Sequence, residues 1–277
     1  MPVMRLATFN ILHGRSVTDD EVDLDRYARA VASLDADILA LQEVDRDQPR
    51  SHGADLTALA AEAMGAVAHR FAATLSGLPT VWSAATGELQ PGTASYGVAL
   101  LSRWPVRSWT VVPLEGMRRP VPVMRPGAEE PTMVRDEPRA AVAAVVETPE
   151  GPLTAVSTHL SFIPEWTPVQ LDRLVAALAH LSRPAALMGD LNMFGTRPAV
   201  LSRWRSLGQA LTFPVDEPDR QIDHILAEGN VRATSEARSV ATDISDHRAL
   251  VVDVALSPAT TGTGPTQPAL VGAGASA

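Results

Sequence analysis

The sequence contains no cysteine and no lysine. Without cysteine there is no disulfide, no thiolate nucleophile and no cysteine-based zinc site, although the cellular compartment is not decided by this absence. Without lysine, all 23 basic residues are arginine. We interpret this uniform bias as an effect of genomic base composition. It therefore assigns no role to any single position, even though arginine suits bidentate phosphate contacts.

Long apolar runs and a basic N-terminal leader are also missing. No stretch approaches the roughly 20 residues of a membrane-spanning helix, and the chain passes directly into a strand pattern. We therefore expect a cytoplasmic monomer without stable membrane insertion. The formal net charge is −9 and aromatic residues make up 4% of the chain. Non-specific duplex binding depends on basic side chains that neutralise phosphates, so nucleic acid is a conceivable partner but not a favoured one.

What the sequence does contain is a series of seven short polar signatures, each closing an apolar run. In chain order they are Thr8-Phe9-Asn10, Leu41-Gln42-Glu43, Tyr96–Arg103, Ser157-Thr158-His159-Leu160, Gly189-Asp190-Leu191-Asn192, Ile222-Asp223-His224-Ile225 and Ser245-Asp246-His247. Most of them are typical of strand ends, and strand ends facing one way let distant segments converge on one site. Carboxylates, amides and imidazoles without a thiol favour a hard divalent cation and a phosphate ester.

The signatures run from Asn10 to His247 without a break at any midpoint. A chain of 277 residues could form two average domains or one large α/β domain, and this continuity favours one. We expect a single catalytic domain over residues 1–256. The remaining residues, 257–277, are rich in proline, glycine, threonine and alanine, which predicts a disordered tail.

Periodicity predicts a mixture of helices and strands. Helices are expected at 23–34, 54–64, 167–181 and 197–204. Strands are expected at 3–12, 37–41, 67–73, 97–101, 106–112, 139–147, 153–158, 185–188, 222–227, 231–240 and 248–256. Neighbouring strands without an intervening helix imply hairpins, so the sheets should be mixed. Residues 113–138 hold six prolines and four arginines without clean periodicity, which indicates a long irregular insertion.

Over residues 4 to about 256 the chain resembles the endonuclease/exonuclease/phosphatase superfamily, a group that includes DNase I-like nucleases and phosphatases. The most specific part is Gly189-Asp190-Leu191-Asn192 followed about fifty residues later by Ser245-Asp246-His247. The resemblance implies an α/β fold, a four-layer α/β/β/α sandwich in which two packed mixed β-sheets carry outer helices. It also implies Mg²⁺, or alternatively Mn²⁺, as the cofactor.

The resemblance assigns roles to the polar residues of the signatures. Asn10, Glu43 and Asp246 would contact the metal. Asp190 would orient and deprotonate the attacking water, and Asn192 would donate to the phosphoryl oxygens. An anionic acceptor beside a neutral donor suits in-line attack of water on phosphorus. His247 would stabilise those oxygens, with Asp223 holding its tautomer.

Five further positions have two interpretations each. His159 is either a phosphate contact, as in relatives, or a hydrogen-bonded histidine at a strand end. Arg139 binds phosphate or forms a surface ion pair, with even support for each. Phe162 and Trp166 either pack beneath the next helix, which we favour slightly, or form an apolar wall for substrate. His13 could reach the rim of the site but is more simply a loop residue, and His224 alternates with Asp223 and should point away.

The function favoured by these residues is a divalent-metal-dependent phosphoesterase that hydrolyses a phosphodiester or phosphomonoester of a small molecule or lipid headgroup. A DNA or RNA nuclease is the alternative, weakened by the net charge and the few aromatic residues. A non-catalytic scaffold of the same fold is less favoured because all core polar positions are intact. The base of the 113–138 insertion should lie at the rim of the site, where Arg118, Arg119, Arg125 and Arg135 could meet anionic groups.

Overall fold

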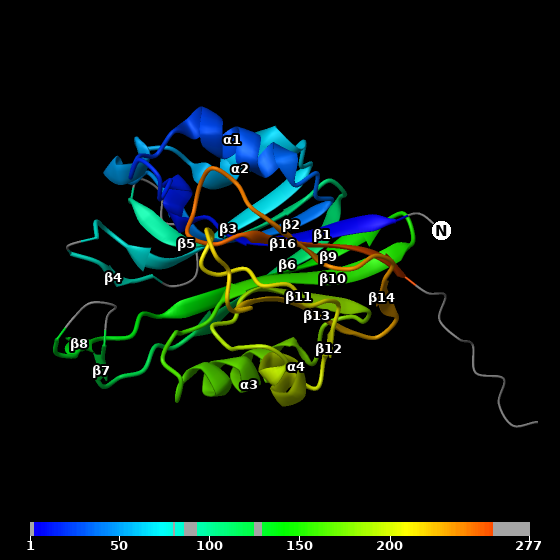
Figure 1. The fold of residues 1–277 in the computed structure, drawn as a ribbon. Coiled ribbons are helices and arrows are strands. Elements are labelled where there is room, and N and C mark those ends of the chain that lie inside the picture. Colours follow the sequence, from blue (N-terminus) through cyan, green and yellow to red (C-terminus); the bar gives the residue numbers. More distant parts are fainter. Residues whose placement is uncertain (1–2, 80, 86–92, 125–128, 257–277) are drawn as a thin grey trace, which may run out of the picture.

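The structure, a computed structural model, describes residues 3–79, 81–85, 93–124 and 129–256. Two β-sheets pack face to face in this part of the chain, and helices cover their outer faces (Figure 1). The fold expected from the sequence, a sandwich of two mixed sheets with outer helices, is thereby confirmed. The predicted tail at 257–277 lies outside the described residues.

The first sheet contains the first and the last strand of the sandwich. Across the sheet its strands are β14 (Val231–Ala233), β16 (Ala249–Leu256), β1 (Met4–Asn10), β2 (Ile38–Arg46), β5 (Ser95–Ser102), β3 (Ala68–Ser76) and β4 (Ser83–Ala84), with β15 (Arg238–Val240) also paired to β16. The pairing of β1 with β2 is parallel and that of β1 with β16 is antiparallel. The parallel pairing of β1 with β2 finishes at the pair Asn10 and Gln42. Asn10 therefore lies next to Glu43.

The second sheet brings three of the signature residues side by side. Its strands are, in order, β12 (Arg205–Ser206), β13 (Asp223–Glu228), β11 (Ala185–Asp190), β10 (Gly151–His159), β9 (Arg139–Thr148) and β6 (Val106–Leu114). Parallel β10 and β11 place His159 opposite Asp190, and antiparallel β13 places Asp223 opposite Asp190. The register alone therefore collects these side chains at one end of the sheet.

Helices α1 (Leu24–Ser33) and α2 (Leu56–Met64) cover the first sheet, whereas α3 (Thr167–Leu178) and α4 (Arg197–Ser202) cover the second (Figure 1). Short 3₁₀ turns occupy Leu12–Gly14 and Pro49–Ser51. The first two α-helices begin at aspartate caps, because Asp23 and Asp55 each accept a hydrogen bond from a backbone N–H of the first turn. Helix α2 ends, as the sequence predicts, at Gly65 in the left-handed conformation.

Three apolar layers hold the sandwich together. The central one lies between the sheets, where side chains such as Leu6 and Val142 are fully buried. A second layer packs α1 and α2 on the first sheet, and the hydroxyl of Tyr27 donates to the carbonyl of Leu56 at 2.8 Å to join the two helices. A third packs Leu171 and Leu174 of α3 on the second sheet. None of the described helices is long and apolar enough to cross a membrane.

Strand β2 departs from the expectation that it ends near Leu41. It continues to Arg46 through a bulge between Leu41 and Val44, at which Glu43 takes a positive φ of 58°. Pairing with β5 resumes at Val44 opposite Gly97, and on its other side Gly97 permits the close approach of Ala72 of β3. The bulge matters for the site because it sets the direction of the Glu43 side chain.

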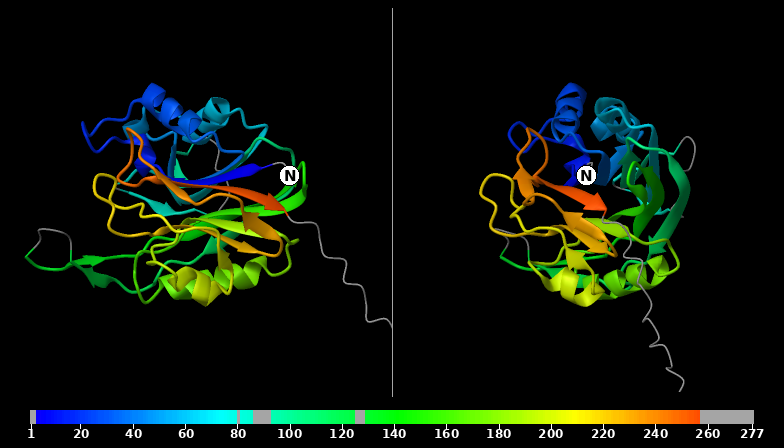
Figure 2. Two further views of the ribbon diagram at one scale, coloured as in Figure 1. Left: turned by 45° about the vertical axis from the view of Figure 1, so that its right-hand side comes forward. Right: turned by 90° about the vertical axis from the view of Figure 1, so that its right-hand side faces the viewer.

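The segment 113–138 is more ordered than its composition suggests. Its first two residues complete β6, and β7 (Val121–Val123) and β8 (Thr132–Val134) form an antiparallel pair. This two-stranded arm projects from one end of the sandwich (Figures 1 and 2). The predicted strand at 231–240 is in turn divided into β14 and β15. There the hydroxyl of Ser235 accepts the N–H of Asp253 in place of a backbone carbonyl.

We predict that Gly97→Ala destabilises the protein by about 3 kcal/mol through overpacking. A Cβ at this position would lie inside contact distance of the backbone carbonyl oxygen of Ala72. Denaturant unfolding would measure the change in free energy. Gly65→Ala provides the comparison, because a Cβ there meets nothing and only the left-handed backbone opposes it, at about 1–2 kcal/mol. Equal losses in both variants would contradict the close-approach argument.

Candidate active site

A cleft of about 550 Å³ opens at the end of the sandwich where the signature strands terminate. Eight of the nine residues to which the sequence assigns a catalytic, metal-binding or phosphate-binding role line it: Asn10, Glu43, Arg139, His159, Asp190, Asn192, Asp246 and His247. Asp223 lies directly behind and reaches the cleft through its hydrogen bond to His247. The first sheet contributes Asn10 and Glu43, the second contributes Arg139, His159 and Asp190, and loops contribute the rest.

The amide of Asn10 links the two sheets at the base of the cleft. Its oxygen accepts the backbone N–H of Leu12 at 3.2 Å, which orients the amide nitrogen toward the carboxylates. That nitrogen donates to Glu43 Oε1 and to Asp190 Oδ2, both at 3.1 Å. Burial raises the pKa of Glu43, and the hydrogen bond from Asn10 opposes this shift. A buried amide thus partly compensates two acids that come from different sheets.

Asp190 is the most strongly held carboxylate in the cleft. Its Oδ1 accepts the backbone N–H of Asn192 at 3.0 Å. The chain turns sharply here, and Asn192 has a positive φ of 49°. Its Oδ2 faces Asn10 and lies 3.4 Å from His159 Nε2. Burial and the neighbouring charge of Asp223 raise the pKa of Asp190 to about 7. A carboxylate with a pKa near neutrality is suited to accept a proton from water.

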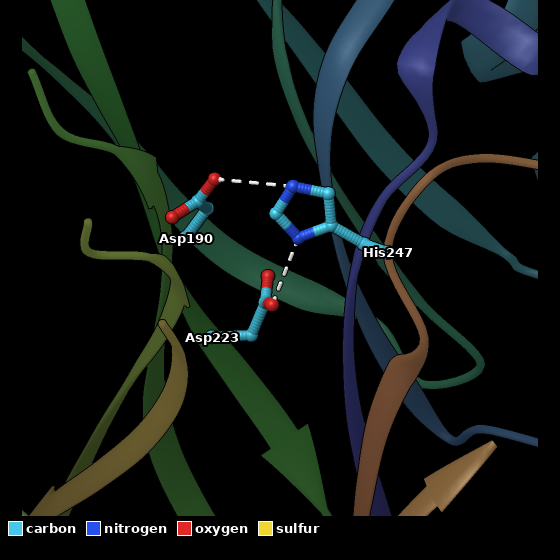
Figure 3. A group of neighbouring side chains, drawn as sticks. All are labelled: Asp190, Asp223 and His247. Carbon is cyan, nitrogen blue, oxygen red and sulfur yellow. Dashed lines mark hydrogen bonds and ion pairs between the residues drawn. The ribbon is translucent and has the colours of Figure 1, made fainter. Parts of the chain in front are cut away.

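His247 forms the opposite wall with Asp223 behind it. Figure 3 shows the imidazole between two carboxylates, with Nδ1 2.9 Å from Asp223 Oδ2 and Nε2 3.8 Å from Asp190 Oδ2. Thr212 Oγ1 donates to the same Asp223 oxygen at 2.6 Å, so Asp223 is fixed from two sides. Burial acts to lower the pKa of His247, but Asp223 overrides it and raises that pKa to about 10. The imidazolium is therefore the form present at neutral pH.

His159 and Arg139 form a cationic corner. A guanidinium can only donate, so His159 Nδ1 accepts from Arg139 Nη1 at 3.3 Å, while His159 Nε2 lies 3.4 Å from Asp190 Oδ2 and 3.3 Å from Asn192 Nδ2. Burial and the Arg139 charge lower the pKa of His159 well below its usual value, so this ring is neutral. Arg139 itself is buried, and among the described residues its Nε has no hydrogen-bond partner. Its Nη2 lies 3.8 Å from Glu137 Oε2, so an ion pair accompanies the contact with His159.

The remaining predicted positions divide between the cleft and the scaffold. His224 donates its Nε2–H to the carbonyl of Met193 at 2.8 Å, and it points away from the cleft as expected. His13 does not line the cleft. Trp166 packs as favoured, since its Nε1 donates to the carbonyl of Glu115. Phe162 does not pack under the helix: it is 41% exposed and lines the cleft, because its loop turns it outward before α3 begins.

The arm formed by the 113–138 segment reaches the cleft at its base only. Arg135, together with Val134 and Glu137, lines the cleft, as expected for the base of the insertion. Arg118 is 88% exposed in its side chain and pairs with Glu115 at 3.6 Å, away from the site. Arg119 lines a separate hollow on the arm. Arg125 lies outside the described residues.

Several cleft residues had no role assigned from the sequence. Tyr96 lies in a quoted signature, and its ring contacts Trp82 with centroids 5.0 Å apart. Arg50 lies over both rings and is anchored by two 2.8 Å bonds to buried Asp45, two residues beyond Glu43. Arg50 thus supports Tyr96 from behind the cleft, and Phe194, Arg197, Phe213 and Arg220 line the cleft itself. These four lie in loops or a short helix without periodicity, so no local signal pointed to them.

Comparison with known proteins agrees with this geometry. A profile described as the endonuclease/exonuclease/phosphatase family matches residues 7–247. The chain therefore belongs to this family, and the sequence-based expectations of the family and of a phosphoric ester hydrolase are confirmed. The family is typically dependent on divalent metal ions. A search of curated proteins found no match.

Solved structures share the fold at low identity. An endonuclease/exonuclease/phosphatase from Beutenbergia cavernae has a TM-score of 0.66 and 24% identity, covering 92% of this chain and 72% of that one. A sphingomyelinase C from Streptomyces griseocarneus has a TM-score of 0.61 and 16% identity, covering 91% and 99%. A mannosyl-6-phosphatase from Bacteroides thetaiotaomicron has a TM-score of 0.59 and 16% identity, covering 91% and 100%.

We predict that Asp223→Asn lowers the pKa of His247 from about 10 toward 6.5, because the variant loses the charge that opposes desolvation. An NMR titration of the His247 ring in metal-free protein would measure it. In the wild type the folded-state pKa is raised, so the stabilisation from this pair is complete below pH 6.5 and disappears as pH rises through about 10. Asp253→Asn, at a carboxylate paired with Arg5, is the control. An unchanged His247 pKa in Asp223→Asn would contradict the assignment.

Proposed function

We propose that this protein is a divalent-metal-dependent phosphoesterase that hydrolyses an ester of a small molecule or lipid headgroup. The observation that carries the proposal is the position of Asp190, whose carboxylate has a pKa of about 7 and faces a cleft lined by neutral donors and cations. Two of the similar solved structures are named for an activity on phosphate esters, a mannosyl-6-phosphatase and a sphingomyelinase C. This agreement supports the class of reaction and leaves the substrate to be proposed from the cleft.

In the proposed reaction, water held by Asp190 attacks phosphorus in line with the leaving oxygen. The bond from phosphorus to that oxygen breaks, the proton of the water passes to Asp190, and the leaving alkoxide takes a proton from solvent. Asn192 and the His247 imidazolium donate to the phosphoryl oxygens as their charge grows. Arg139, whose Nε is buried without a partner, and His159 bind the phosphate beside them.

The residues proposed to hold the cation are Glu43, Asp246 and Asn10. All three line the cleft, and the charge of Asp246 contributes to the raised pKa of Glu43, so the two acids are near enough to act together. Carboxylate and amide oxygens are the donors that Mg²⁺ or Mn²⁺ prefers. When bound, the cation would draw charge from the phosphoryl oxygens.

A second acidic group deserves comparison as a cation site. Among the described residues, ligand atoms of Asp190, Asp223 and His247 lie within 4.8 Å of one another (Figure 3). Asp223 Oδ2, however, is already shared between His247 Nδ1 and Thr212 Oγ1. Asp223 Oδ1 has no hydrogen-bond partner among the described residues, but a cation bound there would meet the protonated imidazole of His247. We therefore place the cation at Glu43 and Asp246.

The balance of charge in the cleft favours a small substrate over a nucleic acid. Four arginines line it, namely Arg135, Arg139, Arg197 and Arg220, and they are matched by the four acids Glu43, Glu137, Asp190 and Asp246. A nuclease groove is expected to carry a clear excess of basic residues. A screen of phosphodiesters, phosphomonoesters and plasmid DNA, with and without EDTA, would test this choice, and robust plasmid cleavage would reverse it. Turnover of no ester would favour the scaffold alternative.

We predict that activity is lost on exhaustive chelation and restored by Mg²⁺ or Mn²⁺. Glu43→Gln keeps the shape of the side chain but removes one anionic ligand. It should raise the Mg²⁺ concentration for half-maximal activity by about 10- to 100-fold, with partial recovery at high metal. Initial rates against metal concentration would measure the shift. Glu62→Gln, on the exposed side of α2, is the matched control. Full activity after chelation would exclude the metal.

Asp190→Ala should behave differently from Glu43→Gln. It removes the proposed acceptor of the water proton, so kcat should fall by at least about 100-fold at every metal concentration. Steady-state kinetics across a metal series would separate the two variants, with thermal unfolding to verify the fold. Asp216→Ala, at an exposed position of the 209–221 loop, is the control. Recovery of Asp190→Ala by added metal would show that Asp190 acts through the cation instead.

A further inference from the structure

A second hollow, the lateral groove, opens beside the cleft and holds about 630 Å³. Its lining residues are Phe194, Gly195, Gln209, Ala210, Leu211, Asp219, Arg220 and Gln221. Phe194 and Arg220 also line the cleft, so the two hollows share a wall. The groove is built from the loop after β11 and from the long connection between β12 and β13. No residue proposed for catalysis lines it.

The lateral groove is uncharged in sum and largely apolar. Phe194 is 63% exposed and Leu211 is 48% exposed, an unusual degree of exposure for two large apolar side chains that line one hollow. Arg220 makes two hydrogen bonds to Asp219, at 2.6 and 3.2 Å, so its charge is neutralised at the rim. The other polar side chains are the amides of Gln209 and Gln221. Such a lining suits a neutral ligand with an apolar or aromatic face.

The wall of the lateral groove is attached to the catalytic pair. Phe213 and Arg220 exchange backbone hydrogen bonds of 3.1 Å, and the Arg220 guanidinium lies 5.4 Å over the Phe213 ring. The other side of that wall contacts the site, since the Phe213 and His247 rings are 4.8 Å apart. The preceding residue, Thr212, donates to Asp223. A group in the groove is therefore held in a fixed position relative to His247.

We propose that the lateral groove binds the substituent that stays esterified to phosphorus, a neutral group with an aromatic or apolar face, and that the preferred substrate is consequently a phosphodiester. The inference rests on the proposed function. In-line attack places the leaving oxygen opposite the water held by Asp190. The retained ester oxygen is then equatorial, and Phe194, in the loop that follows Asp190 and holds Asn192, lines both the cleft and the groove, so a group on that oxygen can extend from the cleft into the groove.

The test compares three substrates that release the same nitrophenolate: bis(p-nitrophenyl) phosphate, methyl p-nitrophenyl phosphate and p-nitrophenyl phosphate. Only the first carries an aromatic retained group. We expect Phe194→Ala and Leu211→Ala to lower kcat/KM for the first about tenfold relative to the second, because they remove the aromatic or apolar partner. Leu201→Ala is the matched control, since Leu201 is equally exposed at 48% but lines neither hollow. It should leave the ratio unchanged.

Equal losses on both diesters, or no loss on either, would overturn the lateral groove as a subsite while leaving the phosphoesterase intact. Turnover of none of the three substrates with any divalent metal would instead refute the proposed function. The groove is then tested by calorimetric binding of bis(p-nitrophenyl) phosphate to Asp190→Ala and to Asp190→Ala combined with Phe194→Ala. Binding about tenfold weaker in the double variant supports the groove, and equal binding overturns it.

Discussion

The amide of Asn10 is the constraint on which the site depends. It donates to one carboxylate from each sheet, at Glu43 and at Asp190, so it fixes the separation of the two sheets where their strands end. Without that amide, each of the two carboxylates would lose a hydrogen-bond donor, at a cost of about 1–3 kcal/mol for a buried group. Behind this edge, the apolar layer between the sheets holds them together. The cleft lies where this apolar layer ends and hydrogen-bonded polar side chains replace it.

Local backbone strain directs the polar groups at this edge. Glu43, Asn192 and Ser245 have positive φ values of 58°, 49° and 70°, a conformation that costs non-glycine residues about 1–3 kcal/mol. Each of these three residues makes a hydrogen bond or contact that would be lost in a relaxed backbone conformation. Ser245 Oγ donates to the Asn10 carbonyl and accepts the N–H of His247, which places the imidazole over Asp223. The long sheets, rather than the loops themselves, supply the stability that offsets this strain.

Much of this arrangement follows from the sequence because its causes are local. Apolar periodicity and aspartate or glycine caps define the helices, and strand-end motifs identify the polar residues that meet in the cleft. The bulge of β2 could not be predicted, because polar Gln42 and Glu43 imitate a strand end and pairing resumes only opposite Gly97. The outward positions of Phe162 and Phe194 likewise depend on how distant loops pack, and no local pattern records that packing.

The two hollows would recognise a substrate through different physical interactions. The cleft holds eight charged side chains of balanced sign together with two histidines, so it discriminates by the position of charge within a phosphate rather than by total charge. The lateral groove has little charge to offer and discriminates by shape and apolar area. Because Phe213 and Thr212 connect its wall to His247 and Asp223, binding energy from a neutral substituent reaches the reacting phosphate through a rigid segment. An enzyme built this way gains specificity from the part of the substrate that does not react, which is where remote binding energy can raise the rate of the step that does.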